Sequence, residues 1–160
     1  MDLTRRLRVV VSSGIAVYLV AVVAGTVAAD GVRAEARVGA SSGIYVEEQA
    51  EVGALAFAAH CASCHGGELQ GGFGPTLAPL DPWQFGDAPL ERLFDLMRSE
   101  MPFDAPGSLD VETYVDVLAF VLRENGYPSG EEPLDSDEDA IARFVLDAPP
   151  PSDRRARGGR

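Results

Sequence analysis

The feature that most constrains this chain is the segment Cys61-Ala62-Ser63-Cys64-His65, which holds the only two cysteines among its 160 residues. Residues three apart lie on the same face of a helical turn, so both thiols can reach the two vinyl groups of one porphyrin and form thioethers. His65 then points toward the iron. The spacing C-x-x-C-H is the attachment signature of c-type haem, so the segment predicts one covalently bound haem.

Three other interpretations of this segment are weaker. A thioredoxin-like redox pair needs a βαβ setting, and the sequence offers none. A zinc site needs ligands from elsewhere, because His60 and His65 cannot both join their neighbouring cysteines in one tetrahedron without strain. A structural disulfide between Cys61 and Cys64 is the simplest alternative.

Residues 1–29 are predicted to be a signal peptide or an N-terminal membrane anchor. Three arginines at positions 5, 6 and 8 precede an uncharged run over residues 9–29, which ends in the small residues Val27-Ala28-Ala29. That ending is typical of a signal peptidase site, but the run is also long enough to cross a bilayer of about 30 Å. Both alternatives place residue 30 onward outside the cytoplasmic membrane, so we expect a periplasmic protein, with residues 9–29 as a membrane tether if they are not cleaved.

Composition divides the remainder into four parts. Residues 30–44 are expected to be a flexible linker, 45–130 a compact domain, 131–148 an acidic extension with a short helix capped by Ser136, and 149–160 a disordered tail rich in proline and arginine. The chain has 25 acidic and 13 basic residues and a net charge of −12. This balance argues against binding to nucleic acid, which requires positive charge opposite the phosphates.

The compact domain is predicted to be all-α, because no stretch alternates as a strand would. The first helix covers residues 47–60, the second follows Asp87 as N-cap, and the third runs from an Asp110 cap to Asn125-Gly126. Apolar residues at helical spacing are expected to form the faces of these helices: Val52, Leu55, Ala56 and Ala59; Leu90, Leu93, Phe94 and Met97; Tyr114, Val117, Leu118, Val121 and Leu122. In the extension, Ile141, Phe144 and Val145 are expected to pack back onto the domain.

A sixth iron ligand is expected from Met97 or Met101. Met97 lies on the apolar face of the second helix, where a core residue is the simpler interpretation. Met101 lies beyond that helix, and Pro102 disfavours helical continuation, so a loop can present the Met101 side chain. We therefore predict His65 and Met101 as the iron ligands. A thioether opposite an imidazole stabilises ferrous iron and leaves no open position for a substrate, which suits electron transfer.

Over most of residues 45–130 the chain resembles a class I cytochrome c. The resemblance is carried by Gly53-x-x-x-Phe57-x-x-x-Cys61-Ala62-x-Cys64-His65-Gly66, Gly74-Pro75-x-Leu77, Trp83, Leu93-Phe94, Met101-Pro102, Pro106-Gly107-Ser108-Leu109 and Asn125-Gly126-Tyr127-Pro128. It implies a class I cytochrome c fold, with three main helices and short helices wrapped around one covalently attached haem. More narrowly, the last motifs are similar to the cytochrome c domains associated with periplasmic quinoprotein alcohol dehydrogenases.

The resemblance also implies roles for individual residues. The Pro75 carbonyl would accept a hydrogen bond from the His65 ring, and Gly53 would let Phe120 approach closely. Trp83 would donate its indole N–H to a haem propionate, or else pack at the edge of the pocket.

The function that follows is that of a monohaem carrier of single electrons, not an enzyme. Its expected partners are a quinoprotein dehydrogenase as donor and a terminal oxidase as acceptor. Two alternatives stay open. One is a haem enzyme or gas sensor whose sixth iron position opens, and the other is a tightly held electron-transfer subunit of a dehydrogenase complex.

Overall fold

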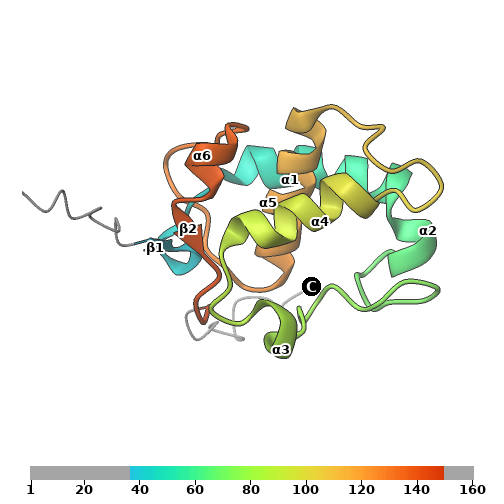
Figure 1. The fold of residues 1–160 in the computed structure, drawn as a ribbon, viewed down its shortest axis with the longest axis horizontal. Coiled ribbons are helices and arrows are strands. Elements are labelled where there is room, and N and C mark those ends of the chain that lie inside the picture. The colour runs from blue at the N-terminus through green and yellow to red at the C-terminus, as the bar shows by residue number, and fades with distance from the viewer. Residues whose placement is uncertain (1–36, 150–160) are drawn as a thin grey trace, which may run out of the picture. The chain divides into compact units, whose positions relative to one another are not determined.

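The computed structural model describes residues 37–149, whose regular structure is mainly helical (Figure 1). Its helices are α1 (Glu47–His60), α2 (Ala62–His65), α3 (Pro82–Phe85), α4 (Leu90–Glu100), α5 (Val111–Glu124) and α6 (Glu138–Ile141), with a 3-10 turn η1 (Ala40–Ser42). Two short strands, β1 (Val38–Gly39) and β2 (Phe144–Val145), complete it. The expected fold, three main helices with short ones between them, is confirmed. The expected signal peptide or anchor, the linker up to residue 36 and the tail from residue 150 lie outside the described residues.

Helix α5 has the boundaries and the buried face that its sequence predicts. The Asp110 carboxylate caps its first turn by accepting from the Thr113 backbone N–H at 2.7 Å. Asn125 is the C-cap, and Gly126 follows with φ +87°, a conformation that favours glycine. All five residues of the predicted apolar stripe are buried: Tyr114, Val117, Leu118, Val121 and Leu122. This helix is therefore the central element against which the others pack.

Helix α1 has the predicted bounds but buries a different face. Its buried residues are Ala50, Gly53 and Phe57, whereas Val52 is 52% and Leu55 is 75% exposed. The prediction that the Val52 and Leu55 stripe faces the core is therefore wrong. From Val52 to Ala59 the helix is apolar on every side, so side-chain polarity does not select the face that packs there.

Gly53 is what selects that face. A Cβ atom at this position would lie 1.8 Å from the Asp116 backbone oxygen of α5, so the two helix backbones meet here at closest approach. The atoms nearest to that Cβ belong to the backbone of Asp116 and Val117. The ring of Phe120, further along α5, packs against Phe57, with ring centroids 5.2 Å apart and planes inclined by 52°.

We expect Gly53→Ala to destabilise the domain by about 3 kcal/mol, the upper end of the cost of overpacking, because α1 and α5 must separate to admit one methyl group. Leu55→Ala is the matched control on the exposed face of the same helix and should change the free energy of unfolding by less than about 0.5 kcal/mol. Urea unfolding of the haem-loaded variants measures both. A larger loss in Leu55→Ala than in Gly53→Ala would contradict this packing.

Helix α4 starts later than the sequence suggests. Its N-cap is Pro89, not Asp87, which lies two residues earlier and donates its backbone N–H to the Leu146 carbonyl at 2.8 Å. The predicted face is otherwise correct, since Leu90, Leu93 and Phe94 are all buried. The start of α4 is thus fixed by the C-terminal segment of the domain.

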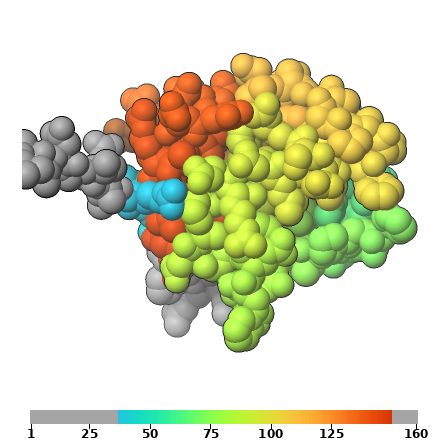
Figure 2. All heavy atoms as spheres, in the orientation of Figure 1, coloured from blue at the N-terminus to red at the C-terminus, as the bar shows by residue number. Residues whose placement is uncertain are grey.

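The two ends of the described chain pair with each other, which the sequence analysis did not anticipate. β1 and β2 form a parallel two-stranded sheet in which Val38 pairs with Phe144 and Gly39 with Val145. Next to it, the Asp147 carboxylate accepts from the Ser41 backbone N–H at 2.9 Å and also from the Ser41 hydroxyl. Figure 2 shows the blue N-terminal segment lying against the red C-terminal one. Residues 38–44 therefore differ from the flexible linker expected there.

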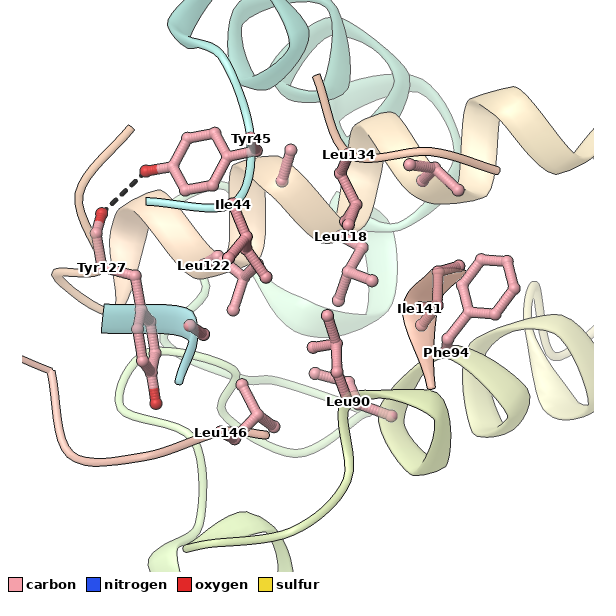
Figure 3. Close-up of a cluster of buried hydrophobic side chains, with 14 of the residues drawn as sticks. Ile44, Tyr45, Leu90, Phe94, Leu118, Leu122, Tyr127, Leu134, Ile141 and Leu146 are labelled. Carbon is pink, nitrogen blue, oxygen red and sulfur yellow. Dashed lines mark hydrogen bonds between the residues drawn. The ribbon is translucent and has the colours of Figure 1, made fainter. Parts of the chain in front are cut away.

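The acidic extension contributes to the main core. Leu134, Ile141 and Leu146 are at most 3% exposed and pack in one cluster with α4 and α5 (Figure 3). In the same region the Tyr45 hydroxyl donates to the Tyr127 carbonyl at 2.7 Å. The helix of the extension, α6, is capped not by Ser136 but by Asp137, whose carboxylate accepts from the Ala140 N–H at 3.1 Å.

Candidate functional site

The C-x-x-C-H segment forms one helical turn directly after α1. Cys61 ends α1 by donating its backbone N–H to the Phe57 carbonyl at 2.8 Å, and the His65 N–H donates to the Cys61 carbonyl at 3.0 Å. The two cysteines therefore lie three residues apart on one turn, and both are free and partly buried. This is the backbone arrangement in which two thiols can reach one flat ring.

Burial, and to a lesser degree the neighbouring Cys64, raises the pKa of the Cys61 thiol to about 11. The thiol of Cys61 is therefore protonated at neutral pH. Since the thiolate is the nucleophile in disulfide exchange, a protonated Cys61 is a poor candidate for thioredoxin-like redox chemistry.

The imidazole of His65 is buried, only 7% exposed, and is held on two sides. Its Nδ1 lies 2.8 Å from the Pro75 carbonyl oxygen. A carbonyl only accepts, so Nδ1 carries the proton and Nε2 keeps its lone pair for a metal. Gly74 packs against the ring, and a Cβ there would lie 2.8 Å from His65 Cε1. Both the tautomer and the orientation of the ring are thus set by the loop that follows it.

Gly74→Ala should displace the His65 ring, because its new methyl group would overlap Cε1. We expect a destabilisation of about 1–3 kcal/mol and a lower yield of haem-loaded protein. Gly67→Ala is the control, since a Cβ at Gly67 meets nothing within 4 Å. Haem absorbance per protein and thermal unfolding measure the effect, and equal behaviour of the two variants would contradict it.

A cavity of about 790 Å³ opens in front of the C-x-x-C-H turn. Most of its wall is apolar and comes from four segments: the end of α1 with α2, the loop from Pro75 to Phe85, α4 with the residues after it, and α5. Cys61, Cys64, His65, Met97 and Met101 all contribute to this wall. Cavities of about 300–1,000 Å³ with mostly apolar walls and few polar groups are typical of cofactor sites. The volume, the two thiols and the nitrogen and sulfur donors fit a haem.

Both candidate methionine ligands line this cavity. Met97 is partly buried and packs against the two hydrophobic clusters of the domain. Met101 is the C-cap of α4, with extended backbone angles (φ −124°, ψ 149°), so the chain leaves the helix at this residue as predicted. The carbonyl of Met101 accepts from the Tyr114 hydroxyl of α5 at 2.6 Å.

Tyr114 is a site residue that the sequence analysis took only as part of an apolar stripe. It lines the cavity and is 3% exposed, so its hydroxyl must find a partner, which is the Met101 carbonyl. The sequence feature that could have indicated this role is a tyrosine among aliphatic residues on the predicted apolar face of a helix, since its hydroxyl needs a hydrogen-bond partner when buried.

Trp83 is not among the residues that line the cavity. It lies on α3, whose other residues Pro82, Gln84 and Phe85 line the cavity, but its own side chain is 97% exposed and is absent from the wall. An exposure of 97% contradicts the expectation that Trp83 packs at the edge of the pocket, whereas its role as a donor to a haem propionate stays a prediction. The cap of α3 by Asp81, which accepts from the Trp83 backbone N–H at 2.9 Å, leaves the Trp83 side chain outward.

Comparison with known protein families agrees with this geometry. Residues 48–121 match the family model described as cytochrome c oxidase, cbb3-type, subunit III. Among solved structures, the chain is similar to a chain in the crystal structure of the sulfane dehydrogenase SoxCD from Paracoccus pantotrophus. The two chains are 24% identical, the similarity covers 79% of this chain and 69% of the SoxCD chain, and the TM-score is 0.46. No curated protein matches significantly.

The matched range runs from α1 through the C-x-x-C-H turn and the cavity wall into α5. The protein therefore contains a c-type cytochrome domain with the class I cytochrome c fold, and its cofactor is a covalently bound haem c. Within residues 37–149, no helix has the length and apolar character needed to span a bilayer.

Proposed function

We propose that this protein is a monohaem electron carrier of the periplasm that takes single electrons from a quinoprotein dehydrogenase and passes them toward a terminal oxidase. The observation that carries the proposal is the cavity wall that brings together two thiols, the Nε2 side of a buried imidazole and two thioethers. A haem held between an imidazole and a thioether supplies reversible one-electron chemistry without an open position for a substrate.

Each residue of the site has a defined role in this proposal. Cys61 and Cys64 would hold the porphyrin covalently, and His65 would bind the iron through Nε2. Met101 would bind the iron through its thioether sulfur. Pro75 and Tyr114 would not bind the iron themselves. The Pro75 carbonyl holds the His65 ring through a hydrogen bond of 2.8 Å, and the Tyr114 hydroxyl holds the Met101 backbone through one of 2.6 Å.

The rim of the cavity supports contact with a protein partner. Phe73, from the loop after His65, and Phe103, from the loop after Met101, are 82% and 72% exposed, and their ring centroids lie 6.2 Å apart. Exposed aromatic side chains of this size are enriched where proteins bind one another. A partner that covers this pair would reach both loops of the site.

The dehydrogenase as electron donor rests on the similarity of the Met101-Pro102, Pro106–Leu109 and Asn125–Pro128 motifs to cytochrome domains of quinoprotein alcohol dehydrogenases. The oxidase as acceptor is supported by the description of the matching family, which names an oxidase subunit. That description equally favours a second candidate function, a tightly held subunit of a redox complex. Copurification with a larger redox protein at high salt would favour the subunit, whereas a monomer on gel filtration would favour the carrier.

The net charge predicts that the rate of association with a redox partner depends on salt. Residues 30–150 hold 23 acidic residues against 6 arginines, a net charge of −17 before haem propionates are counted. Reduction by a quinoprotein alcohol dehydrogenase should therefore slow as salt is added, because the Debye length falls from about 30 Å at 0.01 M to about 10 Å at 0.1 M. Stopped-flow rates at several ionic strengths measure this. A rate that does not depend on salt would contradict electrostatic attraction between the two proteins. If the dehydrogenase does not reduce this protein at all, it is not the partner.

A further inference from the structure

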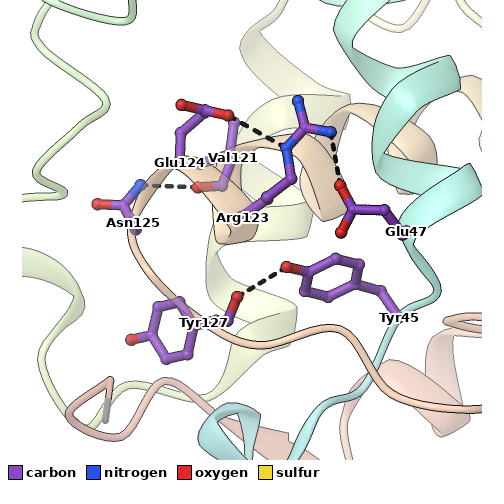
Figure 4. Close-up of polar contacts among 7 residues, drawn as sticks. All are labelled: Tyr45, Glu47, Val121, Arg123, Glu124, Asn125 and Tyr127. Carbon is purple, nitrogen blue, oxygen red and sulfur yellow. Dashed lines mark hydrogen bonds and ion pairs between the residues drawn. The ribbon is translucent and has the colours of Figure 1, made fainter. Parts of the chain in front are cut away.

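The side chain of Asn125 makes three hydrogen bonds at the C-terminal end of α5. Its Nδ2 donates to the Leu77 carbonyl at 2.7 Å and to the Val121 carbonyl at 2.8 Å, and its Oδ1 accepts from the Leu80 backbone N–H at 2.7 Å. Figure 4 shows the amide nitrogen directed at the Val121 carbonyl. A helix C-cap needs none of the bonds to residues 77–80, so the amide has a second task.

That task concerns a cavity wall with no regular structure of its own. Leu77, Pro79 and Leu80 line the cavity but belong to neither a helix nor a strand. Asn125 gives this segment one donor and one acceptor, as a neighbouring strand would. The segment 77–80 is thereby tied to α5, the most buried helix of the domain.

The same segment closely follows Pro75, whose carbonyl accepts a hydrogen bond from the His65 ring. Leu77 is two residues after Pro75, and its N–H donates to the Leu69 carbonyl at 2.8 Å. On the other side of Pro75 in the sequence, the Gly74 N–H donates to the Cys64 carbonyl at 2.9 Å. Pro75 is therefore flanked in the chain by two backbone hydrogen bonds. A shift of Leu77 therefore acts on the Pro75 carbonyl through only two peptide units.

We propose that Asn125 is a positioning residue for the haem site, which holds residues 77–80 and so keeps the Pro75 carbonyl against His65 Nδ1. The inference rests on the proposed function in that His65 is the iron ligand. A hydrogen bond from Nδ1 makes the imidazole a stronger electron donor and favours the oxidised protein. Loss of the Asn125 amide should weaken this bond and raise the reduction potential.

The chain offers a matched control in Gln49 of α1. Its side-chain amide also bonds a loop through one donor and one acceptor, with Nε2 to the Leu134 carbonyl at 3.0 Å and Oε1 to the Leu134 N–H at 2.9 Å. Neither Gln49 nor Leu134 lines the cavity. Gln49→Ala should therefore cost stability in the same way without acting on His65.

The experiment compares the haem-loaded wild type with Asn125→Ala, Asn125→Leu, Asn125→Gln and Gln49→Ala. The measurements are the reduction potential and the solvent exchange rate of the His65 Nδ1 proton by NMR. We expect a higher potential and faster exchange in the Ala and Leu variants, a smaller shift in Asn125→Gln, which keeps an amide, and wild-type values in Gln49→Ala. Asn125→Leu keeps the branched shape of the side chain without its polar atoms and serves if Asn125→Ala does not fold.

Each outcome bears on one claim. Unchanged potential and exchange in the Asn125 variants would overturn the positioning role while leaving the electron carrier intact. The same role is rejected if Gln49→Ala shifts both values equally, or if no Asn125 variant accumulates with haem while Gln49→Ala does. A wild type without covalent haem or reversible reduction would instead refute the proposed function, and the inference with it.

Discussion

The double variant Cys61→Ala/Cys64→Ala is expected to release its haem completely when the denatured protein is extracted with acidified organic solvent, whereas wild-type haem stays with the polypeptide. Both thiols line the cavity from one helical turn, and no other cysteine occurs in the chain. Without thioethers, only axial bonds and apolar contacts retain the porphyrin, and denaturation removes both. Pyridine haemochrome spectra of the extracted and pelleted fractions measure the partition.

The two single variants are the controls. Each should keep one thioether, so haem should stay with the polypeptide while the haemochrome band shifts toward that of a porphyrin with one free vinyl group. If wild-type haem extracts as fully as that of the double variant, the attachment by Cys61 and Cys64 is refuted, and the disulfide becomes the better interpretation.

Met101→Ala is expected to open the iron to carbon monoxide, to abolish the ferric sulfur-to-iron charge-transfer band and to lower the reduction potential. The reason is that a thioether opposite His65 favours ferrous iron and fills the last coordination position. Visible spectra with and without carbon monoxide, together with a redox titration, measure the three effects. Wild-type protein that binds carbon monoxide readily would favour the gas sensor or haem enzyme instead.

Met97→Ala is the matched comparison, because the same thioether lines the same cavity one helical turn earlier. It should keep the charge-transfer band and mainly lose stability, by about 2 kcal/mol, since Met97 packs against both hydrophobic clusters. The reverse pattern would make Met97 the ligand and would contradict the argument from the loop position of Met101.

The parts of the fold that were predictable are those where local signals agree. For α5, a capping aspartate, a clear apolar stripe and the Asn125-Gly126 stop all favour the same helix, and the structure has it. For α1, the bounds were predictable but the buried face was not, because residues 52–59 are apolar on every side of the helix. The face is selected by the fit of Gly53 against the Asp116 backbone, which is a tertiary contact.

The site shows the same division between local and distant contacts. The turn that carries Cys61, Cys64 and His65 follows from sequence spacing alone. The contacts of Tyr114 with Met101 and of Asn125 with Leu77 join residues 13 and 48 positions apart, and a hydrophobic or capping pattern does not indicate them. The prediction that Trp83 packs at the pocket edge was wrong for a related reason, since a single aromatic residue in a segment without a clear pattern does not indicate which way its side chain points.

The contact of Ser41 with Asp147 also has a consequence for the order of folding. These residues are 106 positions apart, so their hydrogen bonds close a loop that contains both α1 and α5. Contacts of such separation carry a high loop-closure entropy and are expected to form after local ones. During synthesis, Asp147 also leaves the ribosome long after the C-x-x-C-H turn. The attachment turn and its helices can therefore be present in a chain whose ends have not yet closed, and a chain cut before residue 144 never closes them.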